Sequence, residues 1–135
     1  MKTFAFLKNT PDWAKQNNCG QYNGYLAIDI KYAHEIIKNA TDAESGEFLY
    51  SYVDLPQPQE ITMHKVTTME KIGPLYPITP IDEEACNSKF IVVGFDTCHS
   101  WNSWEEDNYE SVKKDTLEWL DEVTKHLETI KEMGE

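Results

Sequence analysis

The chain has 135 residues and a mass of 15.6 kDa, so we expect residues 1–135 to form a single domain. Hydrophobic residues make up 40% of it and aromatic residues 12%, which excludes a wholly disordered chain. The chain has 24 Asp and Glu residues, 12 Lys residues and no Arg, which gives a net charge of −12. This balance argues against a groove that follows nucleic-acid phosphates and excludes an arginine clamp.

The first half of the chain predicts two strands, at Thr3–Leu7 and Gly24–Ile30, separated by a loop that contains proline and glycine. A short helix is predicted over Tyr32–Ala40, because apolar residues recur there at helical spacing. Alternating apolar and polar residues predict a further strand over Phe48–Asp54, which two prolines end.

The middle of the chain is predicted to be extended. The Thr and Val content of Glu60–Glu70 favours a strand. Three prolines within Ile72–Ile81 exclude a helix and a central strand there, so we expect a stiff, extended crossing loop. The continuous apolar run in Lys89–Asp96 is typical of a central strand buried on both faces. Thr97–Asn108 follows as a loop rich in Trp, Asn, Ser and acidic residues.

The C-terminal segment predicts a long amphipathic helix, because apolar residues recur there in steps of three and four. This stripe comprises Tyr109, Val112, Thr116, Leu120, Val123, Leu127 and Ile130. Leu117 and Trp119 widen or flank it, and either Asp107 or Asn108 can cap its start. The helix stripe and a sheet face each need a cover. The sequence therefore predicts an α+β fold: a single, mainly antiparallel sheet with a long C-terminal amphipathic helix packed on one face.

Targeting and redox signals are weak. The apolar run Phe4–Leu7 is shorter than the roughly 7–15 residues of a signal-peptide core. No segment approaches the roughly 18 apolar residues of a membrane span. Cys19, Cys86 and Cys98 form no CxxC pair, which argues against a disulfide framework and a zinc knuckle. We expect a reduced protein of the cytoplasm.

One candidate site follows the clearest strand directly. Asp96 would stand at the edge of the sheet, with Cys98 and His99 on the emerging loop. Trp101 and Trp104 add flat apolar faces suited to stacking on a base or packing on a partner. Each feature also has a simpler interpretation: Asp96 caps the turn, Cys98 is a small buried filler, and the tryptophans belong to the core or a lid.

A second group of candidates lies on a predicted strand in the middle of the chain. His64 and Lys65 could contact a phosphate or be ordinary surface residues. A metal site at Asp96 and His99 would need a third ligand such as His64 or Asp29, and the spacing matches no metal motif. We therefore predict no metal, no cofactor and no catalytic residue.

The order of these motifs resembles a family of small, largely uncharacterised proteins encoded by tailed phages and prophages. Gly24–Ile28 is similar to that family's Gly-Tyr-Val-Ala-type strand, and Gly94-Phe95-Asp96-x-x-His99 to its motif before the last helix. Where the family has a His-Gly-Gly-type segment, this chain has His64-Lys65-Val66, without the glycines that would let a backbone approach a ligand closely. The resemblance implies a phage origin more than an activity.

The first functional hypothesis is a phage counter-defence protein that binds and sequesters a nucleotide-derived host immune signal. A tryptophan would stack on the base, Asp96 would bind ribose, and His99 or the His64-Lys65 pair would contact phosphate. The predicted ligand-binding residues are His64, Lys65, Asp96, His99, Trp101 and Trp104.

Two other classes of function stay open. An acidic inhibitor, similar to a DNA mimic, would cover the basic channel of a host defence nuclease. A small hydrolase would use Asp96, Cys98 and His99. The expected partner is thus a nucleotide-derived small molecule or a basic host protein, with no direct binding of nucleic acid or membrane. We also expect a homo-oligomer in the cytoplasm of the host cell.

Overall fold

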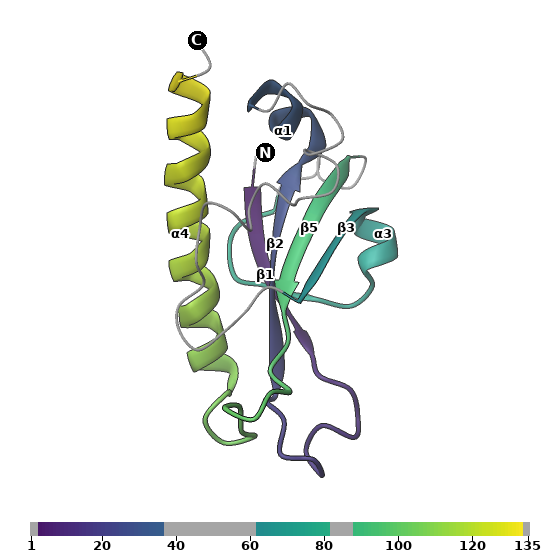
Figure 1. Ribbon diagram of the computed structural model, residues 1–135. Helices are drawn as coiled ribbons and strands as arrows, with labels where there is room; N and C mark the ends of the chain where they lie inside the picture. The colour runs from purple at the N-terminus through teal and green to yellow at the C-terminus, as the bar shows by residue number, and fades with distance from the viewer. Residues whose placement is uncertain (1–2, 37–61, 82–87, 134–135) are drawn as a thin grey trace.

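The computed structural model describes residues 3–36, 62–81 and 88–133, and the predicted strand at Phe48–Asp54 lies outside these ranges (Figure 1). The elements in chain order are β1 (Thr3–Asn9), β2 (Tyr22–Asp29), α1 (Ile30–Ile36), β3 (Met63–Thr68), α3 (Met69–Ile72), β4 (Tyr76–Pro77), β5 (Lys89–Phe95) and α4 (Tyr109–Met133).

The strands form one open sheet in the order β3-β5-β2-β1-β4, and every neighbouring pair is antiparallel. The long helix α4 lies across one face of the sheet and packs on β1 and β2 (Figure 1). This arrangement confirms the predicted α+β fold. Because the long helix α4 covers only one face, the sheet has a helix-covered face and a second face that points away from α4.

The strand β5 is the centre of this arrangement. It pairs with β2 on one side and with β3 on the other, and every residue after Lys89 is buried. A continuous apolar run suits such a strand because both of its faces are covered. The prediction of a central strand buried on both faces is confirmed.

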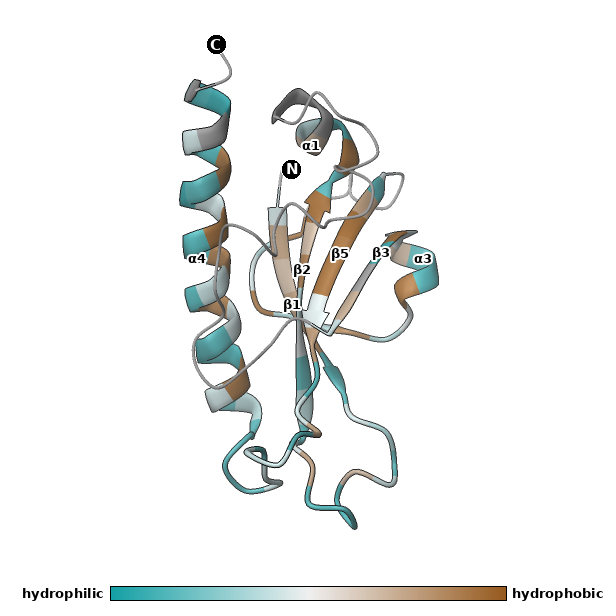
Figure 2. Cartoon of the chain, viewed as in Figure 1, coloured by the Kyte–Doolittle hydropathy of each residue, from teal (hydrophilic) through white to brown (hydrophobic). Residues whose placement is uncertain are grey.

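Two apolar clusters form the core, one on each face of the sheet. The helix-side cluster joins alternate residues of β1, β2 and β5 to the apolar stripe of α4, which is turned toward the sheet (Figure 2). The second cluster consists of Phe4, Phe6, Ala27, Ile72, Phe90 and Val92. Because side chains alternate along a strand, neighbouring residues of each strand belong to different clusters.

The buried stripe of α4 differs from the prediction in its centre. Trp119 is fully buried and packs edge-on against Phe95, with 6.1 Å between ring centroids. Leu120, predicted to lie in the stripe, is only partly buried at the edge of the cluster. Both residues fit the helical spacing, and the large indole fills the space beside Phe95 better than a leucine one position along.

Side-chain caps decide where the helices begin. Asn108 Oδ1 accepts the backbone N–H of Ser111 at 3.1 Å, so Asn108 rather than Asp107 caps α4. Asp29 Oδ1 accepts the backbone N–H of Lys31 at 2.8 Å. This bond starts α1 directly at the end of β2, two residues before the predicted start at Tyr32.

The segment predicted as one strand over Glu60–Glu70 contains both β3 and the start of α3. The helix has only four residues, too few to show a helical period, and it ends at Gly73, whose φ of 79° suits glycine. Within the proline-rich segment, β4 pairs with β1 at the sheet edge, where the missing N–H of a proline is tolerated. The prediction that Ile72–Ile81 contains neither a helix nor a central strand is wrong only at Ile72, which is the last residue of α3. It is confirmed for the residues after Ile72.

Candidate functional site

Asp96 follows β5 and shapes the turn that leaves it. Its backbone N–H donates to Thr62 Oγ1 at 3.1 Å, and its Oδ1 accepts the backbone N–H of Cys98 at 3.0 Å. The simpler interpretation of Asp96, that it caps this turn, is confirmed. Its side chain is still 40% exposed. Asp96 thus combines a structural role with a carboxylate that is accessible to a ligand.

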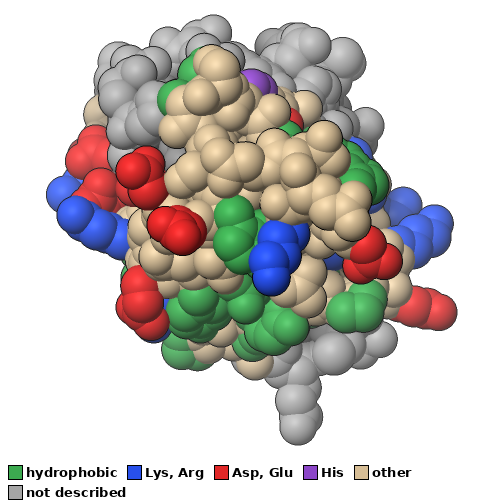
Figure 3. Space-filling model, turned by 90° about the horizontal axis from the view of Figure 1, so that it is seen from below, with side chains coloured by type: hydrophobic (Ala, Val, Ile, Leu, Met, Phe, Trp, Pro, Cys, Tyr) green, Lys and Arg blue, Asp and Glu red, His purple; other side chains and the backbone are tan. Residues whose placement is uncertain are grey.

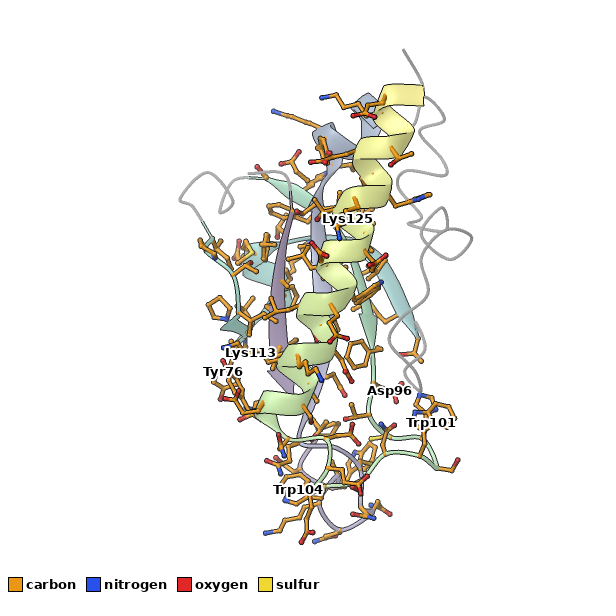
Figure 4. All side chains as sticks on the ribbon, turned by 90° about the vertical axis from the view of Figure 1, so that its left-hand side faces the viewer. Tyr76, Asp96, Trp101, Trp104, Lys113 and Lys125 are labelled. Atoms are coloured by element: carbon orange, nitrogen blue, oxygen red, sulfur yellow. The ribbon has the colours of Figure 1, made fainter. Side chains whose placement is uncertain are left out.

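His99 and Trp101 stack beside this carboxylate, and we call Asp96, His99 and Trp101 the indole platform. The two rings lie 4.5 Å apart between centroids at an angle of 10°. His99 Nε2 lies 3.1 Å from Asp96 Oδ1 but has no hydrogen-bond partner among the described residues. The oxygen therefore lies away from the direction of an Nε2–H bond. Asp96 and Trp101 lie at the same corner of the molecule, below β3 and β5 (Figure 4).

The loop that carries the platform is held by a network of short hydrogen bonds. Thr97 donates its backbone N–H to Asn23 Oδ1 at 3.0 Å and its hydroxyl to the Tyr22 carbonyl at 2.9 Å. Gly20 donates its backbone N–H to the Thr97 carbonyl at 2.7 Å, and a Cβ at Gly20 would stand 2.2 Å from Thr97 Oγ1. His99 donates its backbone N–H to Asn102 Oδ1 at 2.9 Å. These bonds hold the backbone of the loop in place before any ligand arrives.

Trp104 lies apart from the platform. Its backbone N–H donates to Asn18 Oδ1 at 3.1 Å, and its carbonyl accepts Gln21 Nε2 at 2.6 Å. The Lys15 Nζ stands 5.8 Å from the centroid of its ring. Trp104 thus connects the loop after β5 to the loop between β1 and β2, well away from Trp101 (Figure 4). Its role in ligand stacking stays a prediction.

The chemistry of Cys98 argues against a nucleophile. Burial and the neighbouring Cys19 thiol raise the pKa of Cys98 to about 12. The thiolate, which is the reactive form, is therefore scarce at neutral pH. Among the residues that the structure describes, no three His, Cys, Asp or Glu side chains gather as metal ligands.

A pocket of about 240 Å³ opens on the second face of the sheet. It is lined by Phe6, Lys8, Tyr25, Met63, Lys65, Ile72 and Val92. Lys65 is one of the predicted ligand-binding residues, and Lys8 is not. The only signal for Lys8 is the alternation that puts it on the same side of β1 as Phe4 and Phe6.

The pocket has aromatic walls and two positive charges. Phe6 and Tyr25 stack with 5.1 Å between ring centroids and an angle of 10°. Lys8 Nζ donates to the Ile72 carbonyl at 2.7 Å, which fixes its position at the wall. None of the described lining residues is acidic. Burial raises the pKa of Tyr25, a hydrogen bond with Asn23 lowers it and the charge of Asp96 raises it, so the phenol is neutral at physiological pH.

Gly94 gives Tyr25 the space that it occupies. Tyr25 and Gly94 face each other in the β2–β5 register, and a Cβ at Gly94 would stand 2.4 Å from Tyr25 Cδ1. Val92 and Gly94 are alternate residues of β5, and Asp96, which follows β5 directly, raises the pKa of Tyr25 through its charge, so Asp96 lies near the Tyr25 end of the pocket. The close packing of the Tyr25 ring thus explains why the Gly-Phe-Asp-x-x-His motif begins with glycine in this chain.

The pair His64 and Lys65 is only partly described. The backbone of His64 pairs with Val93 and that of Lys65 with Val92, but the His64 side chain lies outside the described part of the structure. Lys65 lines the pocket rather than the indole platform. The ligand role of His64 stays a prediction.

Seen from below, the loop end of the molecule shows scattered lysines rather than a basic patch (Figure 3). Within the described ranges, no helix combines the length and the apolar character needed to cross a membrane. No protein-family model, curated protein or solved structure matches the chain.

Proposed function

We propose that this chain is a phage counter-defence protein that binds and sequesters a nucleotide-derived immune signal in the cytoplasm of the host cell. The observation that carries the proposal is the indole platform. It supplies an exposed flat ring, a stacked imidazole and a carboxylate in one fixed cluster. The phage and host parts of the proposal rest on the resemblance of the Gly94-to-His99 motif.

The platform suits a nucleoside because each group has a matching partner. The indole of Trp101 is 38% exposed, and stacking of a base on an aromatic ring contributes about 1–3 kcal/mol. The carboxylate of Asp96 accepts hydrogen bonds from ribose hydroxyls, as charged acceptors bind neutral donors strongly. Because His99 already stacks on Trp101, the indole is held in place and loses little freedom when the base binds.

Binding is favoured over catalysis by the state of the loop. A hydrolase that used Cys98 would need a thiolate at neutral pH, and a pKa of about 12 leaves almost none. His99 Nε2 contacts Asp96, whose Oδ1 also accepts a backbone N–H. His99 Nε2 has no hydrogen-bond partner among the described residues, so neither a nucleophile nor an orienting carboxylate is bonded to that atom.

Native mass spectrometry tests the proposal on protein purified from cells with active nucleotide signalling. We expect a retained mass of nucleotide size that Trp101→Ala removes. Trp13→Ala is the matched control, because Trp13 is also exposed, at 52%, but lies in the loop between β1 and β2. A protein that carries no small molecule, together with capture of a basic host protein at low salt, would contradict the proposal and support the acidic inhibitor.

A further inference from the structure

We propose that the Lys8–Lys65 pocket is the anion subsite of the same ligand, which therefore carries a diphosphate or a longer anionic arm. This inference rests on the proposed function, because it takes the indole platform as the site of the base. It assigns a role to Lys8, Tyr25 and the second face of the sheet.

The pocket and the platform lie on one path along β5. Lys65 pairs with Val92 and Met63 pairs with Gly94, and all of them except Gly94 line the pocket. Asp96 follows Gly94 by two residues, directly after β5, and its charge acts on Tyr25. Since a strand advances about 3.4 Å per residue, Val92 and Asp96 are about 14 Å apart along β5. Tyr25, opposite Gly94, lies between them.

The charge of the pocket is opposite to that of the chain. The protein carries a net charge of −12, yet two of its lysines line this pocket and none of the described lining residues is acidic. Lys8 gives one N–H to the Ile72 carbonyl, and a lysine ammonium has three N–H donors. The two other donors of Lys8 and the ammonium of Lys65 can therefore bind an anion.

The walls of the pocket strengthen this attraction. The stacked rings of Phe6 and Tyr25, with Ile72 and Val92, give the pocket apolar walls beside the two lysines. Charges attract each other more strongly where the local dielectric constant is lower. An anion placed here gains more from two lysines than it would gain on the open surface.

The distance along β5 selects the ligand class. A nucleoside has no group that reaches from the platform to the lysines, and the phosphate of a monophosphate stays close to its ribose. A nucleoside diphosphate, or a dinucleotide joined through phosphates, extends further from the base site toward the two lysines. We therefore expect affinity to increase with the length of the anionic arm.

Isothermal titration calorimetry with adenosine, AMP and ADP tests the inference on the full chain. Lys65→Ala should weaken ADP binding about 10- to 100-fold, the loss expected for one charged hydrogen bond, and leave adenosine binding unchanged. Lys89→Ala is the matched control, because Lys89 is also an exposed strand lysine of the β3–β5 pair but faces the other way. It should leave both affinities unchanged. Lys65→Gln, which keeps a polar side chain but removes the charge, should reproduce the loss of ADP affinity.

The outcomes separate the inference from the proposed function. Equal affinities for adenosine and ADP, with Trp101→Ala abolishing both, would overturn the anion subsite and leave the platform in place. The same holds if Lys65→Ala, Lys65→Gln and Lys89→Ala all bind ADP like the wild type. If none of the three probes binds the wild type, both proposals are overturned.

Discussion

Replacing Gly94 with alanine should push the Tyr25 ring out of its position over β5. The new Cβ would stand 2.4 Å from Tyr25 Cδ1, 2.7 Å from Cε1 and 3.1 Å from the Gly24 carbonyl oxygen. Real Cβ atoms essentially never come within 3.0 Å of such neighbours, so the ring has to move. Because Tyr25 stacks on Phe6 in the wall of the pocket, the movement also disturbs the pocket.

We expect Gly94→Ala to lower the free energy of unfolding by about 1–3 kcal/mol, the usual cost of overpacking. In a Tyr25→Ala background, the Cβ of Gly94→Ala no longer meets the tyrosine ring. Gly94→Ala should then lower the free energy of unfolding by less than about 1 kcal/mol, because alanine also reduces the conformational entropy of the unfolded chain and so favours folding. The two changes should therefore show a coupling free energy of about 1–2 kcal/mol, within the range found for residues in contact.

Urea denaturation of the wild type, both single variants and the double variant measures this coupling. Gly24→Ala serves as the control, because its Cβ would meet Thr116 Oγ1 and the Phe95 ring on the helix-covered face. Its cost should be the same with and without the Tyr25 ring. Strictly additive effects of Gly94→Ala and Tyr25→Ala would refute the account of how Gly94 positions Tyr25.

Two further predictions concern the core and the loop. Trp119→Ala should lower the free energy of unfolding, measured by urea denaturation, by about 3–5 kcal/mol. Trp119→Phe should lower it clearly less, because this change removes a buried Nε1–H that has no hydrogen-bond partner among the described residues. Equal losses for the two variants would contradict this prediction. The raised pKa of Cys98 contributes stability that is complete below the unfolded thiol pKa of 9.0 and is lost as pH increases toward about 12. The urea midpoint should therefore fall more steeply over that window in the wild type than in Cys98→Ala, and parallel pH profiles would argue against a partly buried, protonated thiol.

The elements with the longest apolar patterns could be predicted from the sequence. β5 has a continuous apolar run, and α4 has apolar residues repeated in steps of three and four. Both patterns extend over several residues and arise from the burial of one face or of both faces of the element. The position of Trp119 could not be predicted in the same way, because Trp119 and Leu120 both fit the helical period. Contact with Phe95, which lies in another element, decides which of them is buried.

The candidate site also has a part that the sequence predicts and a part that it does not. Asp96, His99 and Trp101 lie within six positions of one another, so their proximity on one loop follows from the chain itself. Lys8 and Lys65 share a pocket only because the strand order brings β1 and β3 to either side of β2 and β5. A lysine that alternates with two phenylalanines in an N-terminal strand carries no local signal for such a partner.

A ¹H–¹⁵N correlation spectrum of the tryptophan indole groups during titration with ADP tests whether the indole platform binds the base. The chain has 4 tryptophans, and each indole N–H gives its own signal. The account predicts a saturable shift of the Trp101 signal, with the signals of exposed Trp13 and buried Trp119 unchanged. Saturable binding that leaves the Trp101 signal in place, or no binding at all, would contradict the account.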